Sequence, residues 1–424
     1  MWVGFQDDPN FRWNGDRKQM LDAAVQAHAT VLRTLVDWAT VAPTQPAHAS
    51  DPFDPTYKLD DLDEFVRGAQ ARGAEVLLTI WGTPSWANGG AGPNRVPTKS
   101  ADLTAFAHAL ASRYSGTRPG YPFVRFYSVW DEPNRPRFLT PQQDAAGLYA
   151  GLYRAAYAGI KSGSPKAEVA IGETSAEGST NPVRFAELLA RARPRLRFDA
   201  WALHPYSDEP PAEAKPWPSV TLSQLRRFGT SLDTWFGRKS IPLWITDFSY
   251  ETAPEKSQGV SYTTQAAYVR QALAIATNDA GAQMFVWSIL RDDPTSPRSS
   301  GLLKRDGTKK PAYAAFTAAA APLDARNSIV TAQAGVANPV IRVSALPIAA
   351  NSAPGTTVGI RLSVFDGARS LGTQLPVAPL GADGWLSVTV QLVPRAGHRY
   401  RVLVDAADAH GNRVLRTIEL VATR

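Results

Sequence analysis

The chain has 424 residues, of which 44% are hydrophobic and 20% charged, a composition typical of folded globular proteins. It contains no cysteine, which excludes disulfide scaffolds, thiol catalysis and metal sites with cysteine ligands. The formal charge of +7 arises from 45 basic residues interleaved with 38 acids, so we expect no nucleic-acid partner. The longest Ala-rich stretch, Pro311–Ala321, is too short to span a membrane.

Short apolar runs alternate with amphipathic stretches from residue 1 to about residue 322. The runs predicted as strands are Trp2–Gln6, Val31–Leu35, Glu75–Ile80, Arg125–Trp130, Glu168–Gly172, Asp199–His204, Leu243–Thr246 and Gln283–Ile289. The stretches predicted as helices are Arg17–Ala29, Leu59–Arg72, Ala101–Tyr114, Asp144–Ser162, Pro182–Ala192, Leu222–Phe236, Thr263–Asn278 and Ala312–Ala320. Strict alternation of strand and helix over this length predicts an α/β fold, a parallel (β/α)8 TIM barrel.

The pattern changes after residue 322, where alternation with a period of two replaces the helical period. The alternating runs are Val358–Val364, Leu386–Leu392 and Tyr400–Val404, with turns that contain Gly and Asp between them. This pattern predicts a small, all-β, antiparallel sandwich of immunoglobulin-like type. We therefore expect a catalytic barrel over residues 1–322 and an accessory domain, for packing or adhesion, over residues 323–424.

In a parallel barrel, reactive side chains lie at the carboxyl ends of the strands. The polar and aromatic residues expected there are Arg33, Trp81, Trp86, Asp131, Glu132, Glu173, His204, Tyr206, Asp247 and Trp287. Glu132 and Asp247 follow the fourth and seventh strands, so their carboxylates face each other across the mouth of the barrel. Paired carboxylates in an aromatic cleft suit the cleavage of glycosidic bonds, because one protonates the leaving oxygen and the other stabilises or attacks the anomeric carbon.

Two motifs make the chain resemble the clan A glycoside hydrolases. Trp130–Asn134 (Trp-Asp-Glu-Pro-Asn) is similar to the Asn-Glu-Pro motif of that clan, and Trp244–Ser249 (Trp-Ile-Thr-Asp-Phe-Ser) is similar to its nucleophile motif. The resemblance covers about 320 residues and is closest to families 5 and 39, including bacterial exopolysaccharide hydrolases. It implies that Glu132 is the acid/base and Asp247 the nucleophile of a retaining glycosidase.

The same resemblance assigns substrate contacts around the two carboxylates. Residues of the matching type and strand are Arg33, His204, Tyr206 and Trp287, to which we add Asp131 and the aromatic platforms Trp81 and Trp86. Arg33 is expected to orient a carboxylate, and Asp131 to contact either substrate or Arg33. Glu173 and Glu251 are reserve carboxylates near the mouth. We expect a carbohydrate substrate and neither a cofactor nor a metal ion.

The chain departs from the clan at two positions. Asp247 stands where the clan has Glu, which shortens the side chain by one methylene and withdraws the carboxylate by roughly 1–1.5 Å, toward the wider spacing of inverting enzymes. Asp131 stands where the clan has Asn, and a second carboxylate beside Glu132 is expected to raise the pKa of the pair and to keep Glu132 protonated. An inverting enzyme with Asp247 as base is therefore the main alternative.

Other functions and the cellular location remain open at this point. A carbohydrate-binding pseudoenzyme, with Asp247 as a relic or a helix cap, is the second alternative. A metal-dependent hydrolase is disfavoured because only His204, of six histidines, stands at a strand end. We expect a secreted or cell-surface protein whose signal peptide is absent from this sequence, with a cytoplasmic protein as the alternative. The oligomeric state is not readable from the sequence.

Overall fold

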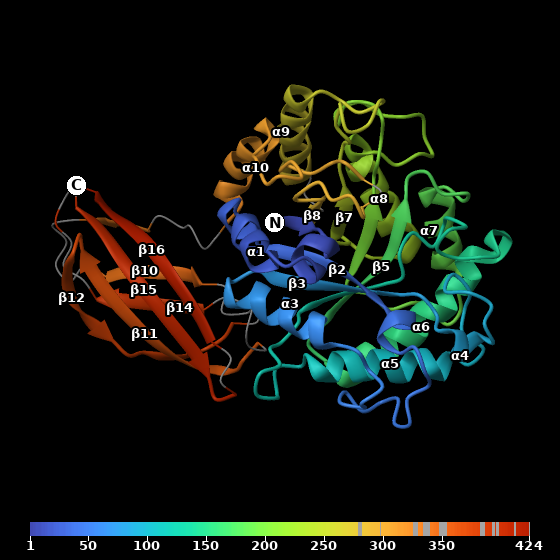
Figure 1. Ribbon diagram of the computed structural model, residues 1–424, viewed down its shortest axis with the longest axis horizontal. Helices are drawn as coiled ribbons and strands as arrows, with labels where there is room; N and C mark the ends of the chain where they lie inside the picture. Colours follow the sequence, from blue (N-terminus) through green and yellow to red (C-terminus); the bar gives the residue numbers. More distant parts are fainter. Residues whose placement is uncertain are drawn as a thin grey trace.

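The computed structural model shows a large α/β unit and a smaller unit built of strands (Figure 1). It describes residues 1–278, 282–296, 298–324, 330–333, 340–346, 354–381, 386–391, 395, 398–410 and 413–423. No helix among these residues is long and apolar enough to cross a membrane.

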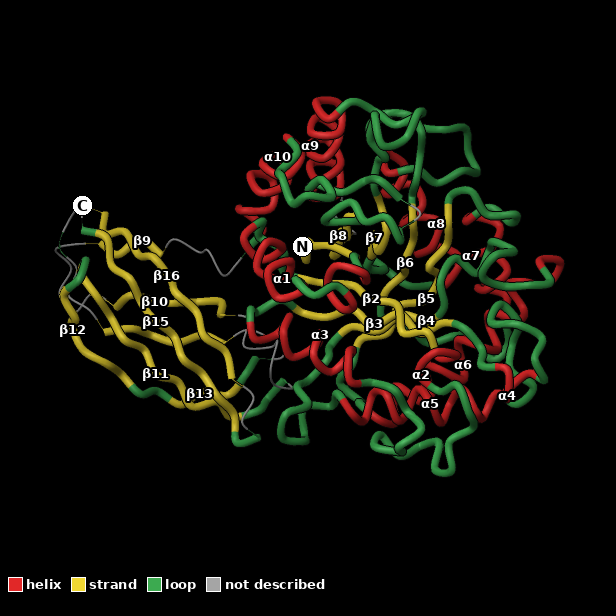
Figure 2. The backbone as a smooth tube through the Cα atoms, in the orientation of Figure 1, coloured by secondary structure: helices red, strands yellow, loops and turns green. Residues whose placement is uncertain are grey.

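The larger unit is a closed barrel of eight parallel strands, with β1 paired to both β2 and β8. The strands are β1 (Trp2–Gln6), β2 (Val31–Asp37), β3 (Glu75–Trp81), β4 (Phe126–Val129), β5 (Glu168–Ser175), β6 (Ala200–His204), β7 (Leu243–Phe248) and β8 (Ala282–Ser288). This topology confirms the predicted TIM barrel. Figure 2 shows the strands enclosed by helices.

Helices alternate with the strands, as the amphipathic pattern predicts. The longer ones are α1 (Arg17–Gln26), α3 (Asp60–Ala71), α5 (Ser100–Arg113), α6 (Ala145–Gly163), α7 (Pro182–Arg191), α8 (Leu225–Phe236), α9 (Tyr262–Asn278) and α10 (Pro311–Ala320). Two short helices were not predicted, α2 (Trp38–Val41) and α4 (Ser85–Asn88), and both begin where a strand has just ended. One turn of helix is too short to show a helical period in a sequence.

The barrel is filled by side chains from its own strands, so its lumen is a packed core and not a channel. The inner cluster consists of Val31, Leu77, Phe126, Ala170, Ala200, Ala202, Trp244, Met284 and Val286, all at most 1% exposed. A second, larger cluster packs the strands against the surrounding helices. These two layers fix the strand ends, and with them the polar residues at the mouth.

The smaller unit is an all-β arrangement, also as predicted. Its strands are β9 (Val330–Gln333), β10 (Val340–Leu346), β11 (Thr357–Asp366), β12 (Arg369–Gln374), β13 (Val377–Pro379), β14 (Leu386–Gln391), β15 (Arg399–Asp408) and β16 (Arg413–Thr423). One sheet pairs β10 with β14, and the other has the order β12-β11-β15-β16-β9, with β13 also paired to β11. One pair departs from the predicted antiparallel arrangement, since β16 and β9 are parallel.

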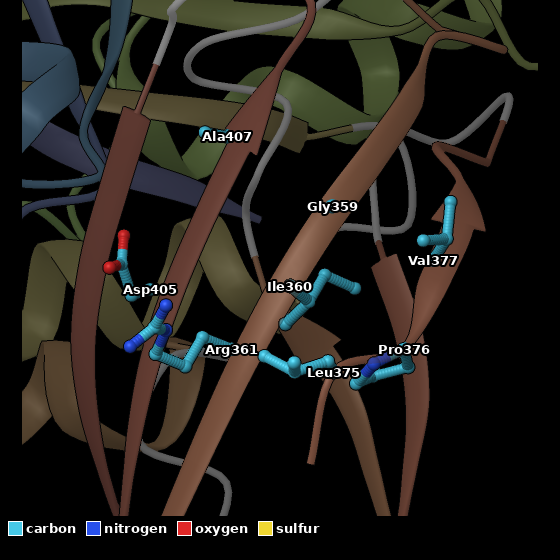
Figure 3. A pocket seen from close by; sticks show the side chains of 8 residues that line it. All are labelled: Gly359, Ile360, Arg361, Leu375, Pro376, Val377, Asp405 and Ala407. Atoms are coloured by element: carbon cyan, nitrogen blue, oxygen red, sulfur yellow. The ribbon is translucent and has the colours of Figure 1, made fainter. Parts of the chain in front are cut away.

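Alternate residues of β11 and β15 are buried, which is the pattern that predicted this unit. Leu392, counted in one of the alternating runs, lies outside the described residues. The boundary proposed between residues 322 and 323 falls within the 3-10 turn η4 (Ala321–Leu323), between α10 and β9. A shallow pocket on the β11 sheet is lined by Gly359, Ile360, Arg361, Leu375, Pro376, Val377, Asp405 and Ala407 (Figure 3). This pocket belongs to the smaller unit and not to the barrel mouth.

Candidate active site

The turn after β4 carries two carboxyl groups into the protein interior. Trp130 and Glu132 have φ angles of 68° and 35°, which place both in the left-handed region that non-glycine residues rarely adopt. The buried Asn134 holds this turn to β5, because its amide donates to the Ser175 carbonyl at 2.7 Å and accepts from the Ser175 N–H at 2.9 Å. The turn is therefore fixed, and Asp131 and Glu132 are only 6% and 4% exposed.

Arg33, on β2, lies beneath these carboxylates with no exposed surface. Its guanidinium donates to Asp131 at 2.9 Å and to Glu173 at 3.2 Å. It also donates to the Thr79 hydroxyl at 3.0 Å and to the Gln6 side chain. The expectation that Arg33 orients a carboxylate fits these contacts, and they make Asp131 its partner. Its complete burial leaves no guanidinium surface for substrate in this structure.

Glu173 is a central residue of the site, although the sequence marked it only as a reserve carboxylate. It follows Gly172 on β5, has a φ of 47°, and is completely buried. Besides Arg33, it accepts hydrogen bonds from the Thr246 hydroxyl at 2.8 Å and from His204 Nε2 at 2.7 Å. These contacts make Glu173 the buried partner of the two cations under the site.

His204 connects Glu173 to Glu132. Its Nε2 faces Glu173, and its Nδ1 lies 3.1 Å from Glu132 Oε1. With a carboxylate at each ring nitrogen, the imidazole donates both hydrogen bonds when it is protonated. Burial lowers the pKa of His204, but the hydrogen bonds to Glu132 and Glu173 outweigh it and raise the pKa to about 10. His204 is therefore an imidazolium at neutral pH.

These contacts reverse one expectation from the sequence. Burial raises the pKa of Glu132, but the hydrogen bond from His204 and the charges of His204 and Arg135 bring it down to about 2. Burial raises the pKa of Asp131 to about 6, against the lowering effect of Arg33. The raised pKa predicted for the pair thus falls on Asp131 and not on Glu132, because the charged donors His204 and Arg135 surround Glu132.

Asp247 lies near the end of β7 and is partly exposed. The Tyr206 hydroxyl donates a hydrogen bond to its Oδ1, and Tyr206 itself packs against Phe248 with ring centroids 6.1 Å apart. The guanidinium of Arg298 lies over the Tyr206 ring, 4.3 Å from its centre. The structure therefore brings Tyr206 and Asp247 into contact and adds Arg298.

A polar cavity of ≈ 300 Å³ opens beside this group. It is lined by Arg135, Glu177, Tyr206, Ser207, Asp208, Ser249, Tyr250, Glu251, Gln258, Val260 and Arg298. Sequence reasoning missed Arg135 and Arg298, which lie in loops with no periodic pattern. The closeness of Arg135 to the Glu-Pro-Asn turn is a signal that could have found it, whereas Arg298 carries no such signal.

The three predicted aromatic platforms differ in their surroundings. Trp81 and Trp86 are partly exposed, and Trp86 donates from its indole to the Ala42 carbonyl at 2.8 Å. Trp287 is completely buried, and its indole N–H donates to the Ser300 carbonyl at 3.0 Å. The role of Trp287 as a sugar platform does not fit this structure, because neither face of its ring is open. Trp287 instead anchors the loop that follows β8.

In the described part of the chain, one group of ligand atoms could hold a metal ion. The nearest polar atoms of Asp131, Glu173 and His204 lie within 4.8 Å of one another. However, the Arg33 guanidinium already donates to Asp131 and Glu173, and both nitrogens of His204 face carboxylates. A metal ion there would have to displace an existing positive charge, so we assign none to this group.

Comparison with protein families identifies the barrel. Residues 2–293 match the model of Cellulase (glycosyl hydrolase family 5). The chain belongs to glycosyl hydrolase family 5. No curated protein matches the sequence of this glycoside hydrolase.

Solved structures with the same fold include other glycosidases. A family 39 glycoside hydrolase from Bacteroides cellulosilyticus WH2 is 18% identical, with a TM-score of 0.57 over 92% of this chain and 79% of that one. A glucosidase from Croceicoccus marinus is 15% identical, with a TM-score of 0.57 over 92% of both chains. A GH5_18 protein from Streptomyces cattleya is 16% identical, with a TM-score of 0.56 over 78% of this hydrolase and 83% of its own chain. The family model confirms the resemblance to family 5, and at these identities the solved structures show a fold shared with a family 39 enzyme.

Proposed function

We propose that the hydrolase cleaves the O-glycosidic bonds of an oligosaccharide, polysaccharide or glycoconjugate with retention of anomeric configuration. Glu132 acts as the acid/base and Asp247 as the nucleophile. The observation that supports this assignment most strongly is the contact between Tyr206 and Asp247, since the hydroxyl holds one carboxylate oxygen of a side chain that is still partly exposed. A carboxylate held in this way is oriented for attack on an anomeric carbon.

The reaction proceeds in two displacements. In the first, an Asp247 oxygen forms an ester bond to the anomeric carbon while the bond to the leaving oxygen breaks and Glu132 supplies a proton to that oxygen. In the second, Glu132 removes a proton from water, the water oxygen attacks the anomeric carbon, and Asp247 leaves as a carboxylate. Asp247 and Glu132 are thereby returned to their starting states.

The proton that Glu132 delivers is shared with His204. In the free enzyme the low pKa of Glu132 and the high pKa of His204 place this proton on the imidazole. The 3.1 Å separation of His204 Nδ1 from Glu132 Oε1 allows the proton to move to the carboxylate once substrate excludes water, because a neutral pair is favoured over an ion pair in a drier site. His204 then regains a proton during the second displacement.

An inverting mechanism is the competing proposal, and it rests on the length of Asp247. Retaining enzymes place their carboxyl groups about 5–5.5 Å apart, and inverting enzymes about 6.5–9.5 Å. Aspartate is one methylene shorter than glutamate, so it favours a gap that admits a water molecule. In that case Asp247 activates the water directly, and no ester forms.

Proton NMR of the first-formed product separates the two mechanisms. We expect the anomer with the configuration of the substrate, observed within minutes of mixing with an aryl glycoside. Asp247→Ala should lower turnover by about 10³-fold or more even with an activated leaving group, because the group that forms the ester is lost. Asp60→Ala, which removes an exposed carboxylate on α3, is the matched control and should turn over normally. A product of inverted configuration would establish the competing mechanism, and full activity of Asp247→Ala would rule out both.

A further inference from the structure

We propose that the sugar bound beside Asp247 carries a carboxylate, as a uronic acid does, and that Arg298 binds it. The inference rests on the proposed function and adds the chemical class of the substrate. Arg298 lies in the loop after β8, partly buried, with its guanidinium over the ring of Tyr206. Tyr206 in turn donates to Asp247, so this cation lies beside the residue that holds the proposed nucleophile.

The Arg298 guanidinium has no anionic partner in the part of the chain that the structure describes. No carboxylate oxygen there lies within 4.0 Å of it, and only its backbone N–H donates a hydrogen bond, to the Ser296 hydroxyl. Asp247, Glu132 and Glu251 act on it only over longer distances. A partly buried arginine normally pairs its planar fork with a carboxylate or phosphate. The missing anion is therefore one that a ligand can supply.

The loop holds Arg298 in place before any ligand binds. The next residue, Ser299, accepts hydrogen bonds at its carbonyl from the Thr252 N–H at 3.0 Å and the Thr252 hydroxyl at 3.1 Å. The carbonyl of Ser300 accepts from Trp287 and from Gln265, each at 3.0 Å. These bonds fix the backbone that follows Arg298, so it is mainly the arginine side chain that loses conformational entropy when an anion binds.

The charges around the site decide how a substrate carboxylate acts on Glu132. The cations are Arg33, Arg135, His204 and Arg298, and the carboxylates are Asp131, Glu132, Glu173 and Asp247. Transfer of a proton from His204 to Glu132 leaves their balance unchanged. A substrate carboxylate offsets the positive charges that keep the proton from Glu132. The same carboxylate stabilises the positive, oxocarbenium-like transition state, which an unpaired Arg298 would oppose.

The acids that line the cavity do not supply this missing charge. Asp208 lies 3.7 Å from Lys215, and Glu251 lies 3.8 Å from Lys256. Glu177 is exposed, so water and salt screen its charge. The second arginine in the cavity, Arg135, donates from one Nη to Glu132 at 3.0 Å. Both arginines line the same cavity, and of the two only Arg135 has a carboxylate partner among the described residues.

The kinetic test compares 4-nitrophenyl α- and β-glycosides of glucuronic and galacturonic acid with the methyl esters of the same sugars. We expect kcat/KM for the preferred uronide to exceed that of its methyl ester about 10- to 100-fold, the range of a charge-assisted hydrogen bond. Arg298→Gln should bring this ratio close to one by lowering kcat/KM for the uronide alone. Arg137→Gln removes an exposed arginine of the neighbouring loop, and it should leave the ratio unchanged.

A binding measurement keeps the inference testable even if no glycoside is cleaved. Thermal unfolding is followed with oligosaccharides from pectate, alginate and hyaluronan, and with carboxyl-reduced forms of each. A rise in Tm that needs the carboxylate and is lost in Arg298→Gln supports the inference. Equal effects of the native and reduced forms, or a rise in Tm that persists in Arg298→Gln, overturn it. Preference for a sulfated sugar over every uronide also overturns it. Cleavage without charge preference would refute this inference alone, and carboxylate-dependent binding without cleavage would refute only the proposed function.

Discussion

His204 decides how charge is distributed among the residues of the site. It is 1% exposed and touches a carboxylate at each ring nitrogen, so one imidazolium serves both Glu132 and Glu173. The opposite charges and hydrogen bonds compensate the cost of burying three ionised groups. The arrangement keeps Glu132 ionised in the free enzyme, which means that substrate must provide the conditions under which Glu132 becomes an acid.

Replacement of Glu132 by glutamine tests its role as the acid/base. The substitution keeps the size of the side chain but removes the proton that the leaving oxygen needs. Turnover should fall by about 10²-fold or more with poor leaving groups and much less with activated aryl glycosides. In a retaining enzyme, azide should restore activity toward the activated substrate and give a glycosyl azide detectable by mass spectrometry. Wild-type rates in this variant would show that another group donates the proton.

Some residues of the site could be predicted from the sequence, and others could not, for physical reasons. Glu132 and Asp247 lie in motifs that tie a residue type to a strand end, so they could be named in advance. Glu173 also ends a strand, but its importance depends on Arg33 and His204, which reach it from other strands. Arg298 could not be predicted as a site residue, because only the path of a loop brings it over Tyr206.

At the scale of elements, the loop after β8 depends on Trp287 for its position. The indole N–H reaches the Ser300 carbonyl from inside the core, and the Ser300 hydroxyl donates back to the Ser288 carbonyl. The loop is thus joined to the end of β8 by contacts on both sides. This explains why a tryptophan that matches a sugar-contacting residue by position is fully buried here.

Trp287→Phe should loosen this loop and weaken the selection of charged sugars. The variant keeps most of the apolar contact and loses the hydrogen bond to Ser300, at a cost of about 0.5–1.5 kcal/mol, because Gln265 still donates to this carbonyl. We expect a lower Tm and a smaller ratio of kcat/KM between a uronide and its methyl ester. Trp201→Phe is the control, because the buried indole N–H of Trp201 has no acceptor among the described residues. Equal changes of the ratio in both variants would show that packing alone controls the loop.

The strands of the barrel and the long helices were predicted to within a few residues, because each repeats a period over many positions. In the smaller unit, the alternating runs had indicated only β11, β14 and β15. The short helices α2 and α4 were not, since one turn shows no period. The parallel pairing of β9 with β16 was also missed, because the direction of a neighbouring strand leaves no trace in the alternation of a short run. The conformations of the loops that shape the cleft could not be predicted either, because a loop repeats no period in the sequence.

For the whole molecule, the smaller unit is expected to be silent in catalysis. Among the described residues, the polar groups around Glu132 and Asp247 come from the barrel and its loops. The two units are joined by contacts such as that from Lys166 to the Pro354 carbonyl. A chain that ends after Asp324 keeps the pair between Asp324 and His28, whose nearest atoms lie 3.0 Å apart. This chain should retain kcat on small soluble glycosides within about twofold, while its Tm or its binding to polymers falls.

Circular dichroism first establishes that the shortened chain is folded, and hydrolysis of the aryl glycoside is then measured. The full-length chain treated in the same way is the control. A folded but inactive shortened chain would mean that the smaller unit contributes to the chemistry.

Arg33 connects more of the barrel than the carboxylates that it orients. Its partners Gln6, Thr79, Asp131 and Glu173 belong to β1, β3, the turn after β4, and β5. Through Glu173 and His204 the same network extends to Glu132, so adding or removing one proton redistributes charge around half the ring of strands. Titrations of such linked groups have macroscopic midpoints that belong to the set and to no single member. The two limbs of a pH–rate profile therefore report this linked set as a whole, and neither limb is the titration of Glu132 alone.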